Sequence, residues 1–429
     1  MTDAGTMHEA TPPADRVAPL HVGPLAVWPP VVLAPMAGIT NAPFRRLCHG
    51  FGTAALAEIG AAPATPSGAA TPTDGETSPA DGGTSIAAQG GLFVSEMITA
   101  RGLAERNDKT LRMARFAADE PVRSIQLYGT DPAAMGEAVR FLASSEHADH
   151  IDLNFGCPVA KVTRKGGGSA LPVHRALFRD VVRAAVRGAG EVPVTVKLRI
   201  GIDDELTTFL DAGRIAQDEG AAAVALHART AAQHYSGRAD WSAIAALREV
   251  VTAVPVLGNG DIWQAADALR MVAETGCDGV VVGRGCLGRP WLFGDLARAF
   301  AGRPVPEAPP LAEVVRVLRR HAHLLAEWLT EPVAVRDVRK HVGWYLQGYP
   351  VGGGVRRRLT ATTTIADLDA ELDRLAASAP EMRILPGADA QPRGKTSGPI
   401  AVTLPDGWLS SADDPSPVVA DELDAVSGG

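Results

Sequence analysis

The strongest constraint on the fold of this chain is a rhythm of short apolar runs that recurs eight times, with helical patterns between most of them. Eight strand-and-helix units over about 240 residues, once a low-complexity segment is set aside, match the repeat of a closed parallel barrel. We therefore predict an α/β protein built on a (β/α)8 TIM barrel, with a doubly wound open sheet as the alternative. The predicted strands lie in VVLAPMAG (31–38), LFVSEM (92–97), RSIQLYG (123–129), HIDLNFG (150–156), PVTVKLRI (193–200), AAVALHAR (222–229), PVLGNGDI (255–262) and GVVVGRG (279–285).

The regions outside these runs differ from them in pattern and composition. Helical patterns without intervening strands follow the barrel, so we predict a barrel domain at 21–305 and a small all-helical domain at 306–380. Residues 60–91 contain 27 Gly, Ala, Pro, Ser or Thr among 32, and such a segment cannot bury enough apolar surface to offset its ordering entropy. We predict three disordered segments: an N-terminal tail at 1–20, an insertion at 60–91 and an acidic C-terminal tail at 381–429.

The net charge does not exclude a nucleic-acid partner. The chain has 41 basic and 49 acidic residues, a net charge of −8. Residues 405–429 alone hold six acidic residues, and without this segment, 1–20 and 60–91 the remainder carries about +3. The four cysteines form no C-x-x-C motif, the N-terminus has no apolar signal segment, and no apolar run reaches the roughly 18–20 residues that span a bilayer. We therefore expect a reduced, cytoplasmic protein without a membrane contact.

Polar residues and glycines stand at the ends of the predicted strands, where a TIM barrel forms its active site. The last run contains GRGCLG (283–288), a literal G-x-G-x-x-G. A dinucleotide-binding fold would need a further strand after it, and the chain turns helical instead. We predict a barrel phosphate site, in which Gly260, Gly283 and Gly285 free backbone N–H groups and Arg284 adds charge. Such a site fits flavin mononucleotide (FMN) and also sugar phosphates.

Cys157 follows the fourth predicted strand, between a glycine and a proline. A thiol at that end of a barrel strand can act as a nucleophile or as a proton donor. The alternative is a small packing residue, which is how we interpret Cys48, Cys277 and Cys286. The position of Cys157 at the expected catalytic face makes it the candidate catalytic residue.

Four polar residues near the strand ends each have a ligand-binding and a structural interpretation. Lys197 lies in an apolar strand, where its ammonium is costly unless it meets an anion or a reduced ring, or escapes at the strand end. His227 could donate to a ligand carbonyl or be a hydrogen-bonded core residue. Gln126 could bind a flat heterocycle or join two loops. Asp261 could bind a ribityl hydroxyl or cap the next helix.

Two basic segments suit a polyanionic substrate. After Cys157, three basic residues precede three glycines, which predicts a mobile cationic lid, with an ordinary solvated loop as the alternative. Residues 311–358 hold nine basic and four acidic residues, and Trp344 and Tyr345 follow a basic cluster. Basic residues interleaved with aromatic rings suit phosphates and unpaired bases, unless the two rings belong to the core.

Taken together, nine segments resemble the tRNA-dihydrouridine synthases, most closely their bacterial B-type branch, over about residues 20–380. The segments are LAPMAGITNAPFR (33–45), VSEM (94–97), IQLYG (125–129), IDLNFGCPVAKVTRKGGGSAL (151–171), VTVKLRIG (194–201), HART (227–230), GNGDI (258–262), VVGRGCLGRPW (281–291) and RKHVGWYLQG (339–348). The sequence departs from the family pattern at Ala228, where the family commonly has glycine, and in the 60–91 insertion and the acidic tail.

The resemblance implies reduction of uridine in tRNA, in which NADPH (or NADH) reduces bound FMN, a hydride passes from flavin N5 to uracil C6, and Cys157 protonates C5. It implies no metal, and we expect a monomer. The implied cofactor-binding residues are Pro35, Met36, Ala37, Gln126, Lys197, His227, Asn259, Gly260, Asp261, Gly283 and Arg284. The implied substrate-binding residues are Asn154, Lys161, Arg164, Lys165, Arg336, Arg339 and Lys340.

Two other functions are compatible with parts of the pattern. One is a flavin-dependent dehydrogenase of a free pyrimidine, of the dihydropyrimidine or dihydroorotate type, which the basic segments disfavour. The other is a non-catalytic RNA chaperone that has kept the fold, which would not need Cys157.

Overall fold

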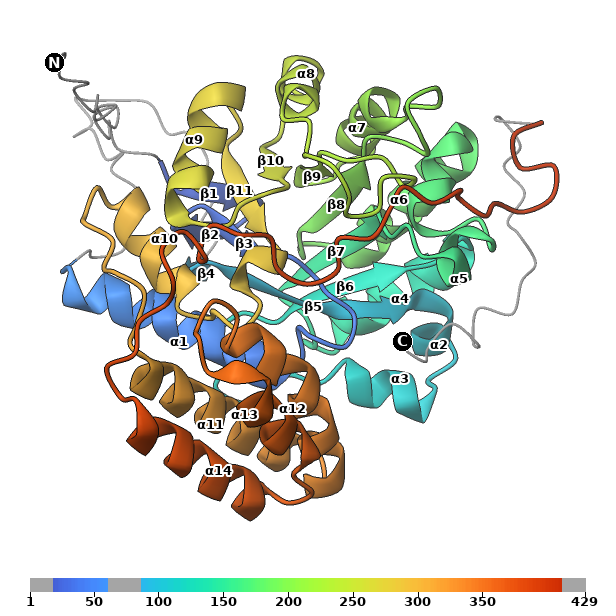
Figure 1. Cartoon of the computed structure of the whole chain (residues 1–429). Coiled ribbons are helices and arrows are strands. Elements are labelled where there is room, and N and C mark those ends of the chain that lie inside the picture. The colour runs from blue at the N-terminus through green and yellow to red at the C-terminus, as the bar shows by residue number, and fades with distance from the viewer. Residues whose placement is uncertain (1–17, 61–85, 411–429) are drawn as a thin grey trace, which may run out of the picture.

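A computed structural model describes residues 18–60 and 86–410, and its centre is a closed barrel of eight parallel strands (Figure 1). Each predicted run contains one barrel strand, so the TIM-barrel prediction is confirmed and the doubly wound alternative is wrong. In barrel order the strands are β3 (Val31–Leu33), β5 (Leu92–Thr99), β6 (Ser124–Tyr128), β7 (His150–Phe155), β8 (Val194–Arg199), β9 (Ala223–His227), β10 (Val256–Asn259) and β11 (Gly279–Val282).

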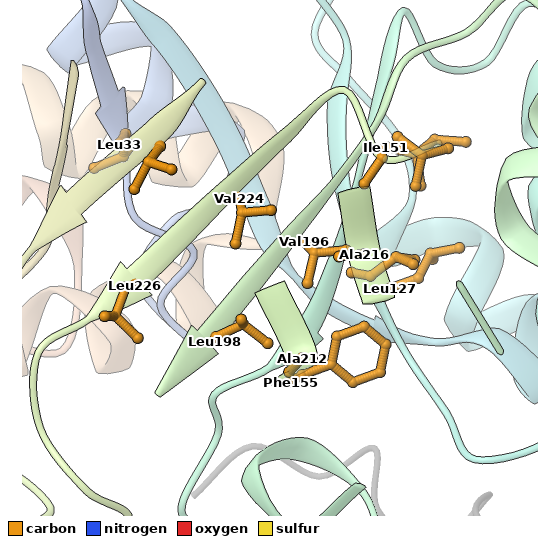
Figure 2. Close-up of a cluster of buried hydrophobic side chains, with 14 of the residues drawn as sticks. Leu33, Leu127, Ile151, Phe155, Val196, Leu198, Ala212, Ala216, Val224 and Leu226 are labelled. Atoms are coloured by element: carbon orange, nitrogen blue, oxygen red, sulfur yellow. The ribbon is translucent and has the colours of Figure 1, made fainter. Parts of the chain in front are cut away.

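Helices surround the barrel and cover the outward faces of its strands (Figure 1). Figure 2 shows part of this packing, with Ala212 and Ala216 of one helix in the same apolar cluster as strand residues such as Val196. On β7, Ile151, Leu153 and Phe155 are buried against them. Because side chains alternate along a strand, Asp152 and Asn154 point to the barrel interior. The surrounding helices are α1 (Ala42–Glu58), α2 (Ala100–Ala104), α3 (Asp108–Met113), α4 (Pro132–Ser144), α5 (Ala160–Thr163), α6 (Arg175–Ala189), α7 (Phe209–Asp218), α8 (Ser242–Val250), α9 (Ala265–Thr275) and α10 (Leu292–Phe300), with short 3-10 turns at η1 (Gly168–Val173) and η2 (Arg284–Cys286).

A three-stranded sheet in the order β1–β2–β4 closes the N-terminal end of the barrel. It contains β1 (Leu20–Val22), β2 (Leu25–Trp28) and β4 (Ile86–Gln89). Apolar residues of β1 and β2 pack with inward-facing residues of the barrel strands, including Leu92 and Ala225. Two predicted disordered segments are therefore too long: Leu20 and residues 86–91 are ordered, because they pair and pack in or beside this sheet. Residues 1–17 and 61–85 of those segments lie outside the described part of the chain.

Four helices form the predicted C-terminal helical region: α11 (Leu311–Trp328), α12 (Glu331–Tyr345), α13 (Gly352–Ala361) and α14 (Ile365–Ser378). They share a core of buried leucine, valine and tyrosine side chains. Helix α11 also packs on α1 of the barrel. The sequence patterns indicated α11, α12 and α14 but missed α13, which begins with three consecutive glycines.

Residues 380–410, which we call the C-terminal strap, contradict the prediction that 381–429 is disordered. The strap has no helix or strand, yet it crosses the open end of the barrel (Figure 1). Arg393 and Trp408 are 1% and 6% exposed, and hydrogen bonds to the connections after β7, β10 and β11 hold the segment. Residues 411–429 lie outside the described chain. Among the described helices, none is long and apolar enough to cross a bilayer.

Candidate active site

A chain of hydrogen bonds connects the barrel interior to the backbone of Cys157. Asp152 accepts from Thr195 Oγ1 and Gln126 Nε2, both at 2.6 Å. Gln126 Oε1 in turn accepts from Asn154 Nδ2 at 2.9 Å, and Asn154 Oδ1 accepts from the backbone N–H of Cys157 at 2.9 Å. Both Gln126 and Asn154 therefore have structural partners, and these partners fix the orientation of their amides.

Cys157 lies immediately beyond β7 and is half-buried. Its carbonyl oxygen accepts from both the N–H and the hydroxyl of Ser169, each at 3.1 Å. Burial raises the pKa of the Cys157 thiol above its usual 9.0, although a backbone hydrogen bond from Val159 and the nearby Arg199 oppose the shift. The thiol is therefore protonated at neutral pH, the state that a proton donor requires. Cys48, Cys277 and Cys286 are at most 2% exposed, as a packing role predicts.

Lys197 points into the barrel and donates to Asn259 Oδ1 at 2.9 Å. Asn259 donates to the carbonyl of Val281 at 2.7 Å, so its side chain links β8, β10 and β11. Burial, with a contribution from Arg199, lowers the pKa of Lys197 to about 8, while Asp152 opposes the shift. A cavity beneath this group is lined by Pro35, Lys197, Asp152 and apolar strand residues. The ammonium is therefore inside the barrel and not at its solvent edge.

The mouth of the barrel contains more cationic than anionic groups. Arg199 is 3% exposed and donates only to carbonyls, those of Gly156, Thr230 and His234. Its burial lowers its pKa to about 10. His227 is neutral, because burial and the charges of neighbouring cations, Arg199 first among them, lower its pKa well below 6.5. Among the described residues, Arg199 has no carboxylate partner, and its buried charge suits an anionic ligand.

Asp261 lies between two arginines after β10. Its oxygens accept from Arg229 Nη2 at 2.7 and 2.8 Å, and one lies 3.7 Å from Arg284. Helix α9 is capped instead by Gln264, so the helix-cap interpretation of Asp261 is wrong. Arg284 is held between the rings of Tyr235 and Trp263, with its guanidinium carbon 4.7 and 5.1 Å from their centroids.

Glycines bring the loops after β10 and β11 close to the expected ligand. Gly260 has φ +136°, and a Cβ there would lie 2.6 Å from that of Ala239. A Cβ at Gly283 would have Ala34 Cβ at 3.5 Å and Met36 Sδ at 4.0 Å as its nearest neighbours. The loops after β3 and β11 therefore adjoin, with space over Gly283.

The loop Pro35–Gly38 is tied to the helical region as well as to the barrel. The N–H of Gly38 donates to Glu96 Oε2 at 2.7 Å, and Lys340 of α12 donates to the Gly38 carbonyl and to Asp337. Ala37 is exposed, while Pro35 and Met36 are half-buried. The structure thus gives Lys340, a predicted tRNA ligand, a bond to the candidate cofactor loop.

The other predicted tRNA ligands lie on two separated surfaces. On one, Arg164 is exposed while Lys161 and Lys165 are half-buried, and the glycines that follow are buried, with Gly166 against the ring of Trp408. On α12, Arg336 and Arg339 are exposed. Tyr345 is 1% exposed and its hydroxyl contacts His321, so it is a core residue, whereas Trp344 is half-buried.

Several residues at the mouth carry no role in the sequence-based prediction. Arg199 and Arg229 are close in sequence to the predicted residues Lys197 and His227. A charged side chain in an apolar run was a signal that could have identified both arginines as residues of the site. Glu96, in VSEM, lies within β5, and Trp263 follows the end of β10. Lys395 and Trp408 lie in a segment whose composition indicated disorder, so no local signal pointed to them.

The fold and the mouth define a class: a TIM-barrel enzyme with cationic side chains at the barrel mouth and a protonated cysteine beside them. Comparison with known proteins gives the family. A family model described as "Dihydrouridine synthase (Dus)" matches residues 32–380, and the chain belongs to the dihydrouridine synthase family. The expected resemblance is therefore confirmed.

Individual relatives agree with this assignment. A "Probable tRNA-dihydrouridine synthase" of Mycobacterium leprae (strain TN) is 52% identical over 401 residues, covering 93% of this chain and 100% of the relative. A protein with the same description from Mycobacterium tuberculosis (strain CDC 1551 / Oshkosh) is 50% identical over 412 residues, with 96% and 97% covered. A "tRNA-dihydrouridine synthase B" of Xanthomonas axonopodis pv. citri (strain 306) is 36% identical over 338 residues, with 79% and 90% covered.

Proposed function

We propose that this chain is a flavin-dependent tRNA-dihydrouridine synthase, which reduces the C5–C6 bond of uridines in tRNA with NADPH or NADH as the reductant. The observation that carries the proposal is the protonated Cys157 thiol, fixed through its backbone N–H and carbonyl beside a cationic barrel mouth. The family assignment supplies the reaction class.

The barrel mouth fits FMN. A phosphate needs backbone N–H groups and cations, and the loops of Gly260 and Gly283 would offer N–H groups, with open space over Gly283 and the guanidinium of Arg284 beside them. Gln126 and Lys197 would meet the ring system, His227 would lie against it, and Pro35–Ala37 would back it, while Asn259 and Asp261 would reach the ribityl chain. Bound FMN would supply the hydride.

Cys157 would supply the proton. Its raised pKa keeps the proton on sulfur until a carbanion-like carbon develops at C5 of the uracil. The thiolate left behind would be stabilised by Arg199, whose positive charge already acts on Cys157 and whose Nε holds the neighbouring Gly156 carbonyl at 2.8 Å. Asn154 would position the base indirectly, because its oxygen holds the Cys157 backbone.

Exposed basic side chains on two surfaces suit a tRNA. Arg164 near the mouth and Arg336 and Arg339 on α12 are free of carboxylate partners among the described residues. Lys161 and Lys165 would add charge beside Arg164. Contacts of this kind must offset the few kcal/mol needed to extract a base from a folded RNA. We also expect the protein to be a cytoplasmic monomer.

The test uses purified protein with NADPH, unmodified tRNA transcript or free uracil, and mass spectrometry of the products. We expect tRNA uridine to gain two mass units with wild type and with the control Cys277→Ala. That control removes a buried thiol just before the start of β11, at the opposite end of the barrel from the mouth. Cys157→Ala should lose about 10²–10⁴-fold in rate. Turnover of free uracil or dihydroorotate without turnover of tRNA would replace this proposal with the free-pyrimidine dehydrogenase.

A further inference from the structure

The C-terminal strap lies outside the part of the chain that defines the family. The family model ends at residue 380, where the strap begins. The match to the Mycobacterium tuberculosis relative covers 412 of the 429 residues and so leaves 17 residues unmatched. Because the strap has 31 residues, at least part of it lies within the match to that relative. The strap is therefore an addition to the family barrel that needs its own explanation.

The strap contacts the loops that carry the candidate reacting groups. Its Lys395 carbonyl accepts from Arg284 Nη1 at 2.7 Å, beside the predicted phosphate site. Further along, the N–H of Ile400 donates to the Ala232 carbonyl at 2.8 Å, in the loop after β9. The Thr403 carbonyl accepts from Thr163 at 2.7 Å. Its last described anchor is Trp408, which reaches the segment after Cys157.

Trp408 clamps residues 166–174. Its Nε1 donates to the Ala170 carbonyl at 3.0 Å, and its own carbonyl accepts from His174 Nε2 at 2.7 Å. Its ring stacks on His174, with centroids 3.7 Å apart. A Cβ at Gly166 would lie 2.5 Å from the Trp408 ring, so the backbone of the segment touches the indole face.

The clamped segment in turn holds Cys157. Gly168 has φ +56°, and a Cβ there would lie 2.5 Å from the Cys157 carbonyl oxygen. Ser169 donates twice to that same oxygen. Since Asn154 of β7 holds the N–H of Cys157, the residue is fixed on one side by the barrel and on the other by a segment that depends on Trp408.

We propose that Trp408 is a positioning residue for Cys157, and that the C-terminal strap is a clasp which keeps the thiol in its reactive place. The catalytic part of this inference rests on the proposed function, whereas the positioning itself does not. Without the indole, the segment 166–174 loses the hydrogen bond from Nε1 to the Ala170 carbonyl and the ring that covers His174, and only the bond from His174 to the backbone carbonyl of residue 408 remains. The Cys157 carbonyl would then move with Ser169.

The experiment measures alkylation of each cysteine by iodoacetamide in the full-length protein, followed by peptide mass spectrometry. We expect Trp408→Ala to raise the labelling rate of Cys157 by about tenfold through local opening, while Cys48, Cys277 and Cys286 stay protected. The matched control is Leu409→Ala, which removes a neighbouring side chain that is 59% exposed and should change nothing. Trp408→Phe keeps a ring and should give an intermediate rate.

The kinetic readout separates positioning from binding. We expect Trp408→Ala to lower kcat on tRNA by about 10–100-fold, as a displacement near 1 Å can do, with KM for tRNA little changed. Unchanged labelling of Cys157 in a folded Trp408→Ala protein would overturn the inference, and so would parallel labelling of all four cysteines, which marks general unfolding. Failure of tRNA turnover in wild type would overturn the proposed function alone, because the labelling test does not use it.

Discussion

Replacing Asp152 with asparagine should separate stability from activity in this barrel. Asp152 is 5% exposed and accepts from Thr195 and Gln126 at the start of the hydrogen-bond chain that ends at the Cys157 backbone. Asp152→Asn keeps the shape of the side chain but turns one acceptor into a donor. Where that donor faces the donating Nε2 of Gln126, the amides of Gln126 and Asn154 must reorient; where it faces Thr195, the hydroxyl must turn to accept and gives up its own bond to residue 152.

The magnitude follows from the pKa of the buried carboxyl. Burial raises the pKa of Asp152 from 3.8 to about 6, against the opposing effects of Thr195, Gln126 and Lys197. The folded state therefore binds this proton more tightly than the unfolded state, and stability falls by about 3 kcal/mol as pH rises from below 4 to above 6. Asparagine removes that penalty, while one mispaired buried donor costs about 1–3 kcal/mol. At pH 7.5 the variant should equal wild type or exceed it by up to about 2 kcal/mol.

Urea unfolding of the flavin-saturated protein at pH 5 and pH 7.5 measures this difference. The free energy of unfolding of the variant minus that of wild type should be about 1 kcal/mol larger at pH 7.5 than at pH 5. In addition, kcat of the variant on tRNA should fall about 10–100-fold because Cys157 is displaced. The matched control is Asp149→Asn. Burial raises the pKa of Asp149, but hydrogen bonds from Arg123 outweigh burial and lower it, so this variant should be less stable than wild type at pH 7.5 and approach it in acid. A loss of more than about 3 kcal/mol for Asp152→Asn at pH 7.5 would refute the reasoning, because it exceeds the cost of the mispaired donor.

Three further variants or conditions test other contacts. Lys340→Met removes the bond from α12 to the Gly38 carbonyl and should weaken FMN binding about tenfold in a fluorescence titration, whereas Arg336→Gln, on the exposed face of α12, should leave it unchanged. Gly168→Ala places a methyl 2.5 Å from the Cys157 carbonyl oxygen at φ +56° and should lower kcat by at least about 100-fold. The control is Gly343→Ala, where the new methyl meets nothing within 4 Å; equal kcat values for the two variants would contradict the contact with Cys157. Because the pKa of Lys197 is lowered to about 8, its ammonium loses its proton above that pH, and the affinity for FMN should fall between pH 7 and pH 9. Lys197→Met should remove this pH dependence of FMN binding. A pH dependence that the substitution leaves unchanged would assign the titration to another group.

The barrel and much of its mouth could be predicted because each signal is local. An apolar run that ends in Asn259, Gly260 or Arg284 carries both its strand and its polar end in a few adjacent residues. Alternation along β7 then places Asp152 and Asn154 on the inner face. Whether Asp261 would cap a helix or bind a ligand could not be decided in this way, since the answer depends on Arg229, which is 32 residues away.

The strap could not be predicted because its order comes from distant partners. Its proline- and glycine-rich sequence has no helical or strand period, so composition indicated a disordered tail. The structure satisfies its backbone with side chains such as Arg284 and Thr163, which lie 111 and 240 residues away in the chain. Local patterns carry no information about pairings at that separation. The helix α13 escaped prediction for a local reason, because glycines at its start disfavour a helix on propensity alone.

The electrostatics of the mouth bear on which cofactor the barrel can hold. Four cationic groups lower the pKa of His227: Lys197, Arg199, Arg229 and Arg284. Two carboxylates oppose these charges, because Asp152 raises the pKa of Lys197 and Asp261 pairs with Arg229 and Arg284. Four positive charges against two negative charges leave an excess of two. Burying such an excess is unfavourable in the free protein, and a phosphate dianion would offset it. A ligand that carries a phosphate at this mouth therefore both binds the charges and stabilises the fold, whereas a neutral pyrimidine alone would leave them unpaired.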